Sequence, residues 1–433
     1  MQTLEQLRSG ALKGAVSLKL SEGLTHFPDE IFELADTLEV LDLSRNELTA
    51  LPADFGRLKK LRILFCSDNP FTVLPEVLGD CPLLDIVGFK ANKIATIPSR
   101  SLNPNVRWLI LTDNAIAELP KEIGHCSRMQ KLMLAGNRLS ELPEELGRCH
   151  NLSLLRISAN RLKVLPEWLL SMPRLSWLAC SGNLFSTRPQ IAALPSISWS
   201  ELNVHHVLGE GASGIIFKGV HCTGAQNKDV AVKVFKGSVT SDGLPEDEMD
   251  AFIAAGAHSG MVRLTGQIAD HPDGKKGLVM DLIPERFYNL GQPPTFASCT
   301  RDVFKPGMQL SVAQVVKIAA TIASVAHQLH TNGIMHGDLY AHNTLIDEEG
   351  NTLFGDFGAA SFYDRSATHA AFLLERIEVS AFGYMLDDLL SVCSGATEKT
   401  TVSIIRSIRD AAIAPTVSSR PGFEYLAGEL MKL

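Results

Sequence analysis

Long apolar runs and paired cysteines are missing from this 433-residue sequence. No run approaches the roughly 18 apolar residues of a membrane helix, so we do not expect a membrane span. The N-terminus lacks a basic stretch followed by an apolar core, so we do not expect a secretion signal either. The eight cysteines include no CxxC pair, which argues against a zinc site or a disulfide framework and favours a reducing compartment. We therefore expect a soluble, cytoplasmic protein.

An excess of basic residues is also missing. The formal net charge is −8; residues 1–198 hold 22 Lys+Arg and 21 Asp+Glu, and residues 199–433 hold 18 and 27. Neither half is basic enough to suggest a nucleic acid as a partner. The length predicts two or three domains, because one hydrophobic core rarely serves a chain of this size.

A repeat of about 23 residues runs through the first half of the chain. Each copy holds an Asn inside a frame that approximates LxxLxLxxN, and a proline follows six residues later. The seven asparagines are Asn46, Asn69, Asn92, Asn114, Asn137, Asn160 and Asn183. This pattern is typical of leucine-rich repeats, in which the leucines share a core that no single copy could bury. We expect the Asn side chains to hydrogen-bond buried backbone groups.

The first half is similar to cytoplasmic leucine-rich repeat proteins with an LxxLPxxLGxL consensus, such as the Scribble-like and Ras-suppressor-like groups. Residues 118–124 (ELPKEIG) and 141–147 (ELPEELG) carry the likeness, which covers roughly residues 15–190. A degenerate copy at Leu18–Leu24 and a helix-like start over residues 3–12 predict an N-terminal cap.

Strand alternation predicts which side chains project from the inner, concave face of the repeat array. The residues six and four positions before each Asn include many large apolar side chains. Apolar patches and aromatic residues are typical of protein interfaces. We therefore expect a protein partner on this face, contacted by Phe65, Trp108, Ile110, Met133 and Trp177. The alternative is that part of this stripe packs on the chain's own second half or only covers the core.

Four motifs follow one another in the second half. They are Gly209–Gly214 (GEGASG), Val230–Lys233 (VAVK), His336–Asn343 (HGDLYAHN) and Gly355–Gly358 (GDFG). The glycines let backbone N–H groups approach phosphates, and the lysine can reach the same phosphates as a point charge. A single glycine motif is a weak signal, but four motifs in register indicate one phosphoryl-transfer site.

The second half resembles eukaryotic-type protein kinases, closest to the tyrosine-kinase-like branch, over residues 202–430. Glu378–Gly383 resembles the DxWxxG helix of that family, and Arg420–Leu426 resembles its RPxFxxL segment. The predicted fold class is an α/β leucine-rich repeat solenoid over residues 1–198, followed by an α+β bilobal protein kinase-like domain over residues 199–433.

The resemblance implies ATP and Mg²⁺ as cofactors. Asp338 is expected to accept or orient the proton of the attacking hydroxyl, and Lys233 to hold the α- and β-phosphates. Asn343 and Asp356 are expected to hold magnesium, which prefers oxygen ligands. The expected ATP-binding residues are Leu208, Gly209, Gly211, Gly214, Ile216, Ala231, Lys233, Met280, Asp281 and Ile283.

The ion-pair partner of Lys233 is less well defined by the sequence. The segment 246–252 is acidic and compatible with a helix. Glu248 is the first candidate, and Glu246 and Asp250 are alternatives.

Three features depart from the family pattern. Gly337 stands where many kinases have an arginine that neutralises a phosphate on the activation loop, so control by loop phosphorylation is not expected. Tyr340 replaces the lysine that helps Ser/Thr kinases bind the γ-phosphate, and His342 or another loop residue is the candidate for that lost charge. Glu378 follows Asp356 by only 22 positions, which leaves little chain for docking a peptide.

These patterns favour a protein kinase that transfers the γ-phosphate of ATP to Ser or Thr hydroxyls, with the repeats recruiting a substrate or regulator. The first alternative is a pseudokinase scaffold that binds nucleotide and transfers little phosphate. A small-molecule phosphotransferase is a further alternative, because HGDxxxxN also occurs in aminoglycoside-kinase relatives. The complete glycine motif and the RPGF segment argue against it.

Overall fold

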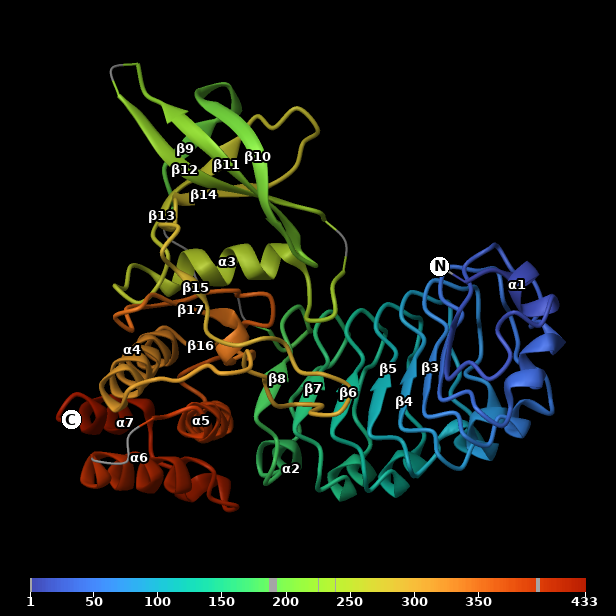
Figure 1. Cartoon of the computed structure of the whole chain (residues 1–433). Helices are drawn as coiled ribbons and strands as arrows, with labels where there is room; N and C mark the ends of the chain where they lie inside the picture. Colours follow the sequence, from blue (N-terminus) through green and yellow to red (C-terminus); the bar gives the residue numbers. More distant parts are fainter. Residues whose placement is uncertain (1, 187–192, 225, 238, 395–397) are drawn as a thin grey trace. The chain divides into compact units, whose positions relative to one another are not determined.

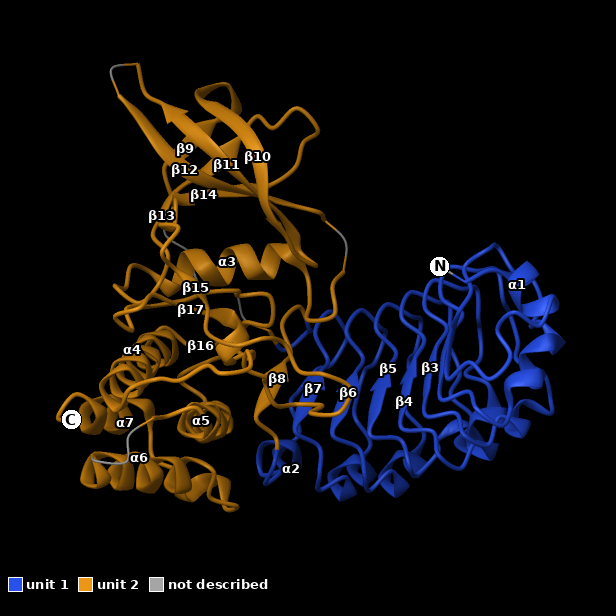
Figure 2. Cartoon of the chain, in the orientation of Figure 1, with its two compact units in different colours: residues 1–174, 183–185 blue, residues 175–182, 186–433 orange. Residues whose placement is uncertain are grey.

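The computed structural model describes residues 2–186, 193–224, 226–237, 239–394 and 398–433. The chain forms two compact units, one of Met1–Arg174 with Asn183–Phe185 and one of Leu175–Gly182 with Ser186–Leu433 (Figure 2). The units therefore divide inside the last repeat. The domain boundary that we expect between residues 198 and 199 stays a prediction, and the proline of the last repeat, Pro189, lies outside the described residues.

The repeat region contributes one short strand per copy, and the strands follow one another in a single sheet (Figure 1). The strands are β1 (Ser17–Lys19), β2 (Val40–Asp42), β3 (Ile63–Phe65), β4 (Ile86–Gly88), β5 (Trp108–Ile110), β6 (Lys131–Met133), β7 (Leu154–Arg156) and β8 (Trp177–Ala179). Neighbours from β1 to β7 are parallel and in register, so that residues at equivalent repeat positions lie side by side.

Short helical turns return the chain from one strand to the next. They are η1 (Asp29–Leu34), η2 (Phe55–Arg57), η3 (Glu76–Asp80), η4 (Ser99–Ser101), η5 (Lys121–His125), η6 (Glu144–Arg148) and α2 (Glu167–Leu170). The N-terminal cap contains α1 (Leu4–Arg8), which begins at a capping box formed by Thr3 and Gln6.

The repeat asparagines satisfy buried backbone groups. The Asn137 Nδ2 group donates to the carbonyls of Leu111 (2.9 Å) and Leu134 (3.0 Å), and its Oδ1 accepts from the N–H of Ile116 (3.0 Å). The bonds to Leu111 and Ile116 tie this repeat to the previous one. The residue before the Asn often has a positive φ, and alanine fills this position twice, at Ala91 (53°) and Ala159 (52°).

The second unit begins with a mixed sheet in the strand order β10-β11-β12-β14-β13-β9. Its strands are β9 (Ser196–Ser198), β10 (Leu202–Glu210), β11 (Gly214–Cys222), β12 (Asn227–Phe235), β13 (Leu264–Ala269) and β14 (Gly277–Asp281). The short turn η7 (Trp199–Glu201) lies between β9 and β10, and the helix α3 (Pro245–Ala255) lies between β12 and β13. Alternate residues of β12, Val230, Val232 and Val234, share an apolar core with Ile268 and Val279.

The rest of the second unit is mainly helical. Its elements are β15 (Tyr288–Asn289), α4 (Val312–Thr331), β16 (Ile334–Met335), η8 (Ala341–Asn343), β17 (Thr344–Ile346), β18 (Thr352–Phe354), β19 (Ser361–Phe362), α5 (Thr368–Ser391), α6 (Lys399–Ala412), η9 (Val417–Ser419) and α7 (Phe423–Leu430). A parallel sheet in the repeats and a mixed sheet with helices after them confirm the predicted fold class.

Helix α4 is the one described helix that is long and apolar enough to span a membrane. Half of its most apolar stretch is buried within the protein, and core helices commonly pass the same test of length and composition. The helix begins at Ser311, which forms a capping box with Gln314.

Candidate active site

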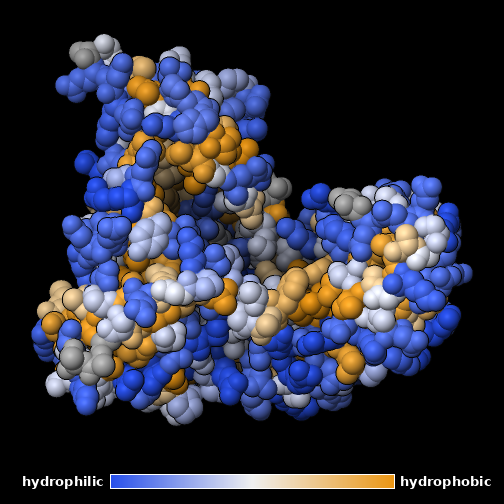
Figure 3. Space-filling model, viewed as in Figure 1, coloured by the Kyte–Doolittle hydropathy of each residue, from blue (hydrophilic) through white to orange (hydrophobic). Residues whose placement is uncertain are grey.

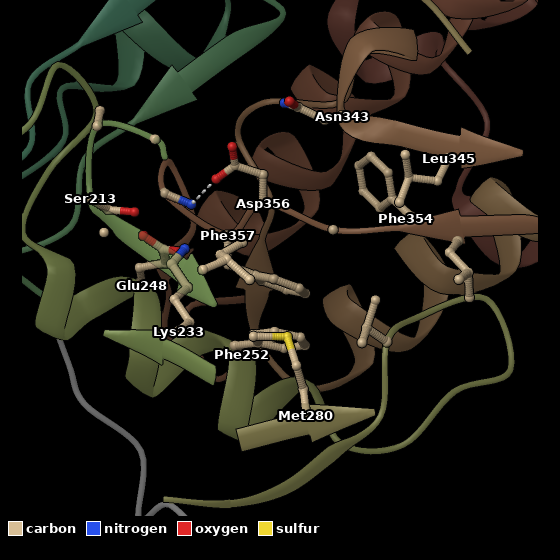
Figure 4. Close-up of a pocket in the computed structure, with 18 of the residues that line it drawn as sticks. Ser213, Lys233, Glu248, Phe252, Met280, Asn343, Leu345, Phe354, Asp356 and Phe357 are labelled. Carbon is tan, nitrogen blue, oxygen red and sulfur yellow. Dashed lines mark hydrogen bonds and ion pairs between the residues drawn. The ribbon is translucent and has the colours of Figure 1, made fainter. Parts of the chain in front are cut away.

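A cavity of about 350 Å³ in the second unit brings residues of all four motifs or their flanks together (Figure 4). Of the residues predicted from the sequence, those lining it are Gly211, Gly214, Ile216, Lys233, Glu248, Met280, Ile283, Asn343 and Asp356. Five predicted residues are not among the lining residues: Leu208, Gly209, Ala231, Asp281 and Asp338. Ala231 is buried in β12, whereas the side chain of Leu208 is exposed on β10.

Lys233 of β12 and Glu248 of α3 form an ion pair at the wall of this cavity (Figure 4). The side chains are 12% and 2% exposed, respectively, so the pair is largely removed from water. Burial raises the pKa of Glu248, and the Lys233 ammonium opposes that rise. The structure thus pairs Lys233 with Glu248, the first of the three candidate carboxylates. Glu246 instead pairs with Lys276.

The three glycines of the first motif differ in their surroundings. A Cβ atom at Gly209 or Gly211 would meet no other atom within 4 Å. At Gly214 it would lie 2.6 Å from the carbonyl oxygen of Val234 in the neighbouring strand. The first two glycines therefore leave open space beside the backbone, whereas Gly214 permits the close approach of β11 and β12.

The catalytic loop, His336–Asn343, is held by hydrogen bonds on two sides. Asn343 Nδ2 donates to the carbonyl (2.9 Å) and to Oδ2 (2.8 Å) of Asp338. On the other side, the buried carboxylate of Glu378 in α5 accepts from the N–H groups of His336 (3.1 Å) and Gly337 (2.6 Å). The position of Asp338 is therefore fixed through its backbone and its side chain.

Asp356 adopts a left-handed backbone conformation, with φ of 59°. Few residues other than glycine do so, although Asp is enriched among those that do. Its Oδ1 accepts from the N–H of Gly358 at 3.2 Å (Figure 4), and its side chain is exposed to the cavity. Backbone strain of this kind is concentrated at functional sites.

Sequence reasoning missed the aromatic groups that support Asp356. The ring of Phe357 stacks on Phe252 of α3, with centroids 4.7 Å apart, so the Asp-Phe-Gly motif packs against the helix that carries Glu248. His336 Nε2 also lies 3.1 Å from the carbonyl oxygen of Gly355, the residue before Asp356. In the sequence, Phe252 is an ordinary apolar residue of an amphipathic helix, so no signal identified it.

His342 lies in the cavity wall next to Asn343 and is held by Asp302, a residue that the sequence did not suggest. The distance between His342 Nδ1 and Asp302 Oδ1 is 2.7 Å, and the His342 N–H donates to Asp302 Oδ2 at 3.0 Å. Burial alone would lower the pKa of His342, but the hydrogen bond to Asp302 and nearby carboxylates raise it above its ordinary value.

For Trp177 the structure shows the alternative reading of the concave stripe, in which a side chain packs on the chain's own second half. We expected its side chain on an open concave face, but it is 1% exposed and packs within the second unit. Its ring stacks on Tyr340 of the catalytic loop. The expectation fails because strand alternation gives the direction of a side chain and not what covers it.

The other residues of the predicted partner-binding stripe belong to the repeat unit. Phe65, Trp108, Ile110 and Met133 are half-buried. Figure 3 shows apolar residues gathered over strands β3–β6 of this unit. Trp108 also lies beneath the Lys131 ammonium, which is 4.4 Å from the ring centroid.

Two family models match the chain. The model described as protein kinase domain matches residues 202–399, and the leucine-rich repeat model matches residues 11–71, 104–162 and 127–185.

Several relatives match parts of the chain. A probable serine/threonine-protein kinase of Dictyostelium discoideum is 26% identical over 53% of this chain and 14% of its own length. The L-type lectin-domain containing receptor kinase VIII.1 of Arabidopsis thaliana is 27% identical over 46% of this chain and 26% of its own. The mouse leucine-rich repeat and calponin homology domain-containing protein 1 is 29% identical over 29% of this chain and 18% of its own length. The chain thus spans about a quarter or less of each of these relatives. The repeats, the site geometry and the family matches agree, and the chain consists of leucine-rich repeats followed by a protein kinase domain.

Proposed function

We propose that this chain is a protein kinase that uses ATP and Mg²⁺ to phosphorylate Ser or Thr hydroxyls of proteins, and that it acts in the cytoplasm. The observation that carries the proposal is one cavity lined by the Lys233–Glu248 ion pair, Asn343 and Asp356, with Asp338 bonded to Asn343. The Ser/Thr preference is supported by the names of relatives such as the Dictyostelium kinase.

The residues present fit a magnesium nucleotide. Gly211 leaves open space where phosphates could approach backbone N–H groups, and Lys233 supplies a cation fixed by its partner carboxylate. Because the amide N–H group of Asn343 donates a hydrogen bond to Asp338, the amide oxygen faces another partner and can join the Asp356 carboxylate as a metal ligand. Bound magnesium would neutralise negative charge on the phosphates during transfer.

The chain's own residues then orient and deprotonate the acceptor. Asn343 Nδ2 donates to one carboxylate oxygen of Asp338 and so orients the carboxylate, which we assign to accept the proton of a Ser or Thr hydroxyl. Glu378 fixes the backbone of the same loop. His342 lies in the cavity wall, where it is the side chain best placed to stand in for the lysine that Tyr340 replaces.

A pseudokinase scaffold is the second candidate, and one observation favours it. Tyr340 occupies the position of a phosphate-binding lysine in the related kinases, and it is 4% exposed and stacked against Trp177. No cation can therefore come from that position. Without this cation, the electrostatic stabilisation of the transition state for phosphate transfer is weaker.

A phosphotransfer assay with radiolabelled ATP, generic protein substrates and autophosphorylation separates the two candidates. We expect the substitution Asp338→Ala to lower turnover by about 10²–10⁴-fold, the usual scale for a positioned acid or base. Asp273→Asn, an exposed carboxylate in a loop, is the matched control and should leave turnover unchanged. Equal activity of wild type and Asp338→Ala would refute the assigned role. A wild type that binds ATP by calorimetry and transfers no phosphate would favour the scaffold.

We further propose that the repeats recruit a substrate or regulator through Phe65, Trp108, Ile110 and Met133. Support comes from the apolar residues over β3–β6, because apolar patches of this kind mark interaction sites (Figure 3). Affinity capture with wild type and Trp108→Glu tests the proposal, with the exposed Glu118→Lys as control. Capture of the same proteins by Trp108→Glu would contradict it.

A further inference from the structure

The strand of the last repeat is embedded in the second unit. We call residues 175–182 the docking strand; they contain β8 and belong to the same compact unit as the catalytic loop (Figure 2). Helix α5 and β8 are in contact. The docking strand makes four contacts with three parts of the unit: two with the catalytic loop, one with the segment that follows Asp356, and one with α5.

The first contact joins Trp177 to the catalytic loop. The indole stacks on the ring of Tyr340, with centroids 4.6 Å apart and an interplanar angle of 3°, and it also stacks on Tyr384 of α5. The Trp177 Nε1–H group donates to the carbonyl of Leu339 at 3.1 Å, so its single polar group is satisfied where it is buried. Leu339 directly follows Asp338, and the indole therefore holds the backbone next to the proposed base.

The second contact explains Gly337. This residue has a φ of 73°, and a Cβ atom there would lie 2.5 Å from the carbonyl oxygen of Leu178 and 2.7 Å from that of Ala359. No side chain fits at this position while the docking strand is in place. The two departures from the family pattern in the catalytic loop, Gly337 and Tyr340, thus share one cause, because both residues face the docking strand.

The third contact reaches the segment after Asp356. The N–H of Cys180 donates to the buried Ser361 Oγ at 2.9 Å, and Ser361 pairs with Met335 in the ladder between β19 and β16. The β16 strand leads directly into the catalytic loop. Only residues 359–367 separate the Asp-Phe-Gly motif from the start of α5 at Thr368. The docking strand therefore holds this short segment through a buried hydrogen bond.

The fourth contact links the docking strand to α5. Ser176 Oγ and Ser380 Oγ are 2.7 Å apart, and both side chains are buried. Ser380 lies two residues after Glu378, which accepts hydrogen bonds from the catalytic loop. The same segment of α5 therefore binds both the docking strand and the catalytic loop.

We propose that the docking strand is a permanent part of the catalytic domain, with Trp177 as a positioning residue that holds the catalytic loop in its active conformation. In this proposal the docking strand provides the structural support that a longer activation segment provides in the related kinases. The inference rests on the proposed kinase activity only for its turnover readout. Support, not inhibition, is the role we assign, because none of the described docking-strand residues lines the nucleotide cavity and the Lys233–Glu248 pair is formed.

Substitutions at Trp177 and Trp168 in the full chain test this inference. Trp168 is the matched control, because it is a half-buried tryptophan of the repeat unit and has no proposed part in catalysis or partner binding. We expect Trp177→Ala to lower kcat at least tenfold while the KM for ATP changes less than about twofold. Trp177→Phe keeps an aromatic ring without the N–H donor and should fall between wild type and Trp177→Ala. Trp168→Ala should stay within twofold of wild type in both constants.

Hydrogen exchange gives a second readout that needs no turnover. We expect the backbone amides of residues 336–345 to exchange at least tenfold faster in Trp177→Ala than in wild type, and at the wild-type rate in Trp168→Ala. If Trp177→Ala does not fold, the same comparison is made with Trp177→Phe.

Unchanged exchange in the loop of a folded Trp177 variant would overturn the inference, and so would a rise in kcat, which would make the docking strand an inhibitor. A wild type without phosphotransfer would remove the proposed function. Faster loop exchange in Trp177→Ala would then still support the positioning role.

Discussion

The carboxylate of Glu378 accepts a hydrogen bond from the backbone N–H of Gly337, and the distance from Gly337 N to Glu378 Oε1 is 2.6 Å. It also accepts from the N–H of His336, and its Oε2 lies 2.8 Å from His330 Nε2. The carboxylate is 1% exposed. A buried charge of this kind is tolerated only when its hydrogen bonds are complete, so the catalytic loop and α5 depend on each other.

Replacing Glu378 with Gln should destabilise the protein and change its pH dependence. The amide cannot accept all of these hydrogen bonds, so we expect the free energy of unfolding at pH 7 to fall by about 2–3 kcal/mol. Burial alone would raise the pKa of Glu378, but the His330 hydrogen bond, the nearby histidines and the Gly337 N–H lower it below the ordinary value of 4.5. A lowered pKa in the folded state stabilises the protein above the unfolded pKa, and this contribution is lost as the pH falls.

Urea unfolding of both proteins between pH 7 and pH 3 measures this difference. The advantage of wild type over Glu378→Gln should shrink as the pH falls below about 4.5. Glu285→Gln, an exposed carboxylate, should differ from wild type by less than about 0.5 kcal/mol. An advantage that stays constant down to pH 3 would contradict the assigned ionisation of Glu378.

Removing Lys233 should leave the buried carboxylate of Glu248 without its cation. Breaking one partner of a buried ion pair typically destabilises a protein by about 3–5 kcal/mol, so we expect a loss near the lower end for Lys233→Met. The double variant Lys233→Met/Glu248→Leu should recover most of that loss, because both buried charges are then gone. Chemical denaturation of the two variants measures the coupling. A double variant as unstable as Lys233→Met would show that the pair is not buried as described.

Asn137 should contribute far more to the stability of the repeat unit than an exposed asparagine does. Asn137→Ala leaves the carbonyls of Leu111 and Leu134 and the N–H of Ile116 without their partner. We expect a loss of about 3 kcal/mol in the free energy of unfolding. Asn105→Ala, which removes a solvent-exposed bond to the Pro82 carbonyl, should lose less than about 1 kcal/mol. Equal losses of stability in the two variants would mean that the repeat asparagines add no buried hydrogen bonds.

The repeat region could be predicted from the sequence because the turn of each repeat restricts which residue types can occupy its marked positions. An asparagine every 22–23 residues satisfies backbone groups that each turn leaves unpaired, so its spacing predicts the repeats directly. The kinase motifs are similarly explicit, because each residue type supplies one part of phosphate chemistry. The left-handed residues at Ala91 and Ala159 carry no such signal, since their conformation is imposed by the turn and not favoured by alanine.

The same patterns left open that part of the concave stripe packs on the second half of the chain, but they could not show that Trp177 is the residue that does so. Trp177 and Trp108 occupy equivalent positions in their repeats, so the repeat period alone predicts the same direction for both side chains. What distinguishes them is a contact with Tyr340, which lies 163 residues later in the chain. The residues Gly337 and Tyr340 were visible as departures from the kinase pattern. Their common cause became visible only when the structure placed Leu178 beside Gly337.

Gly337 should tolerate alanine much less well than a glycine with the same backbone conformation and free space around it. Gly274 is such a glycine, with φ of 65° and no atom within 4 Å of the position that a Cβ would occupy. Gly274→Ala should lose about 1–2 kcal/mol, the strain of the left-handed conformation alone. Gly337→Ala should lose about 2 kcal/mol more, because its Cβ collides with the Leu178 and Ala359 carbonyl oxygens.

Thermal and urea unfolding of the two variants, with turnover as a second measurement, separates strain from collision. We expect Gly337→Ala to reduce turnover as well, since moving Leu178 away from the catalytic loop also moves Trp177. Gly274→Ala should keep wild-type turnover. If the two glycine variants lose the same stability, then Leu178 does not approach Gly337 closely, and the docking strand cannot be what excludes an arginine from this position.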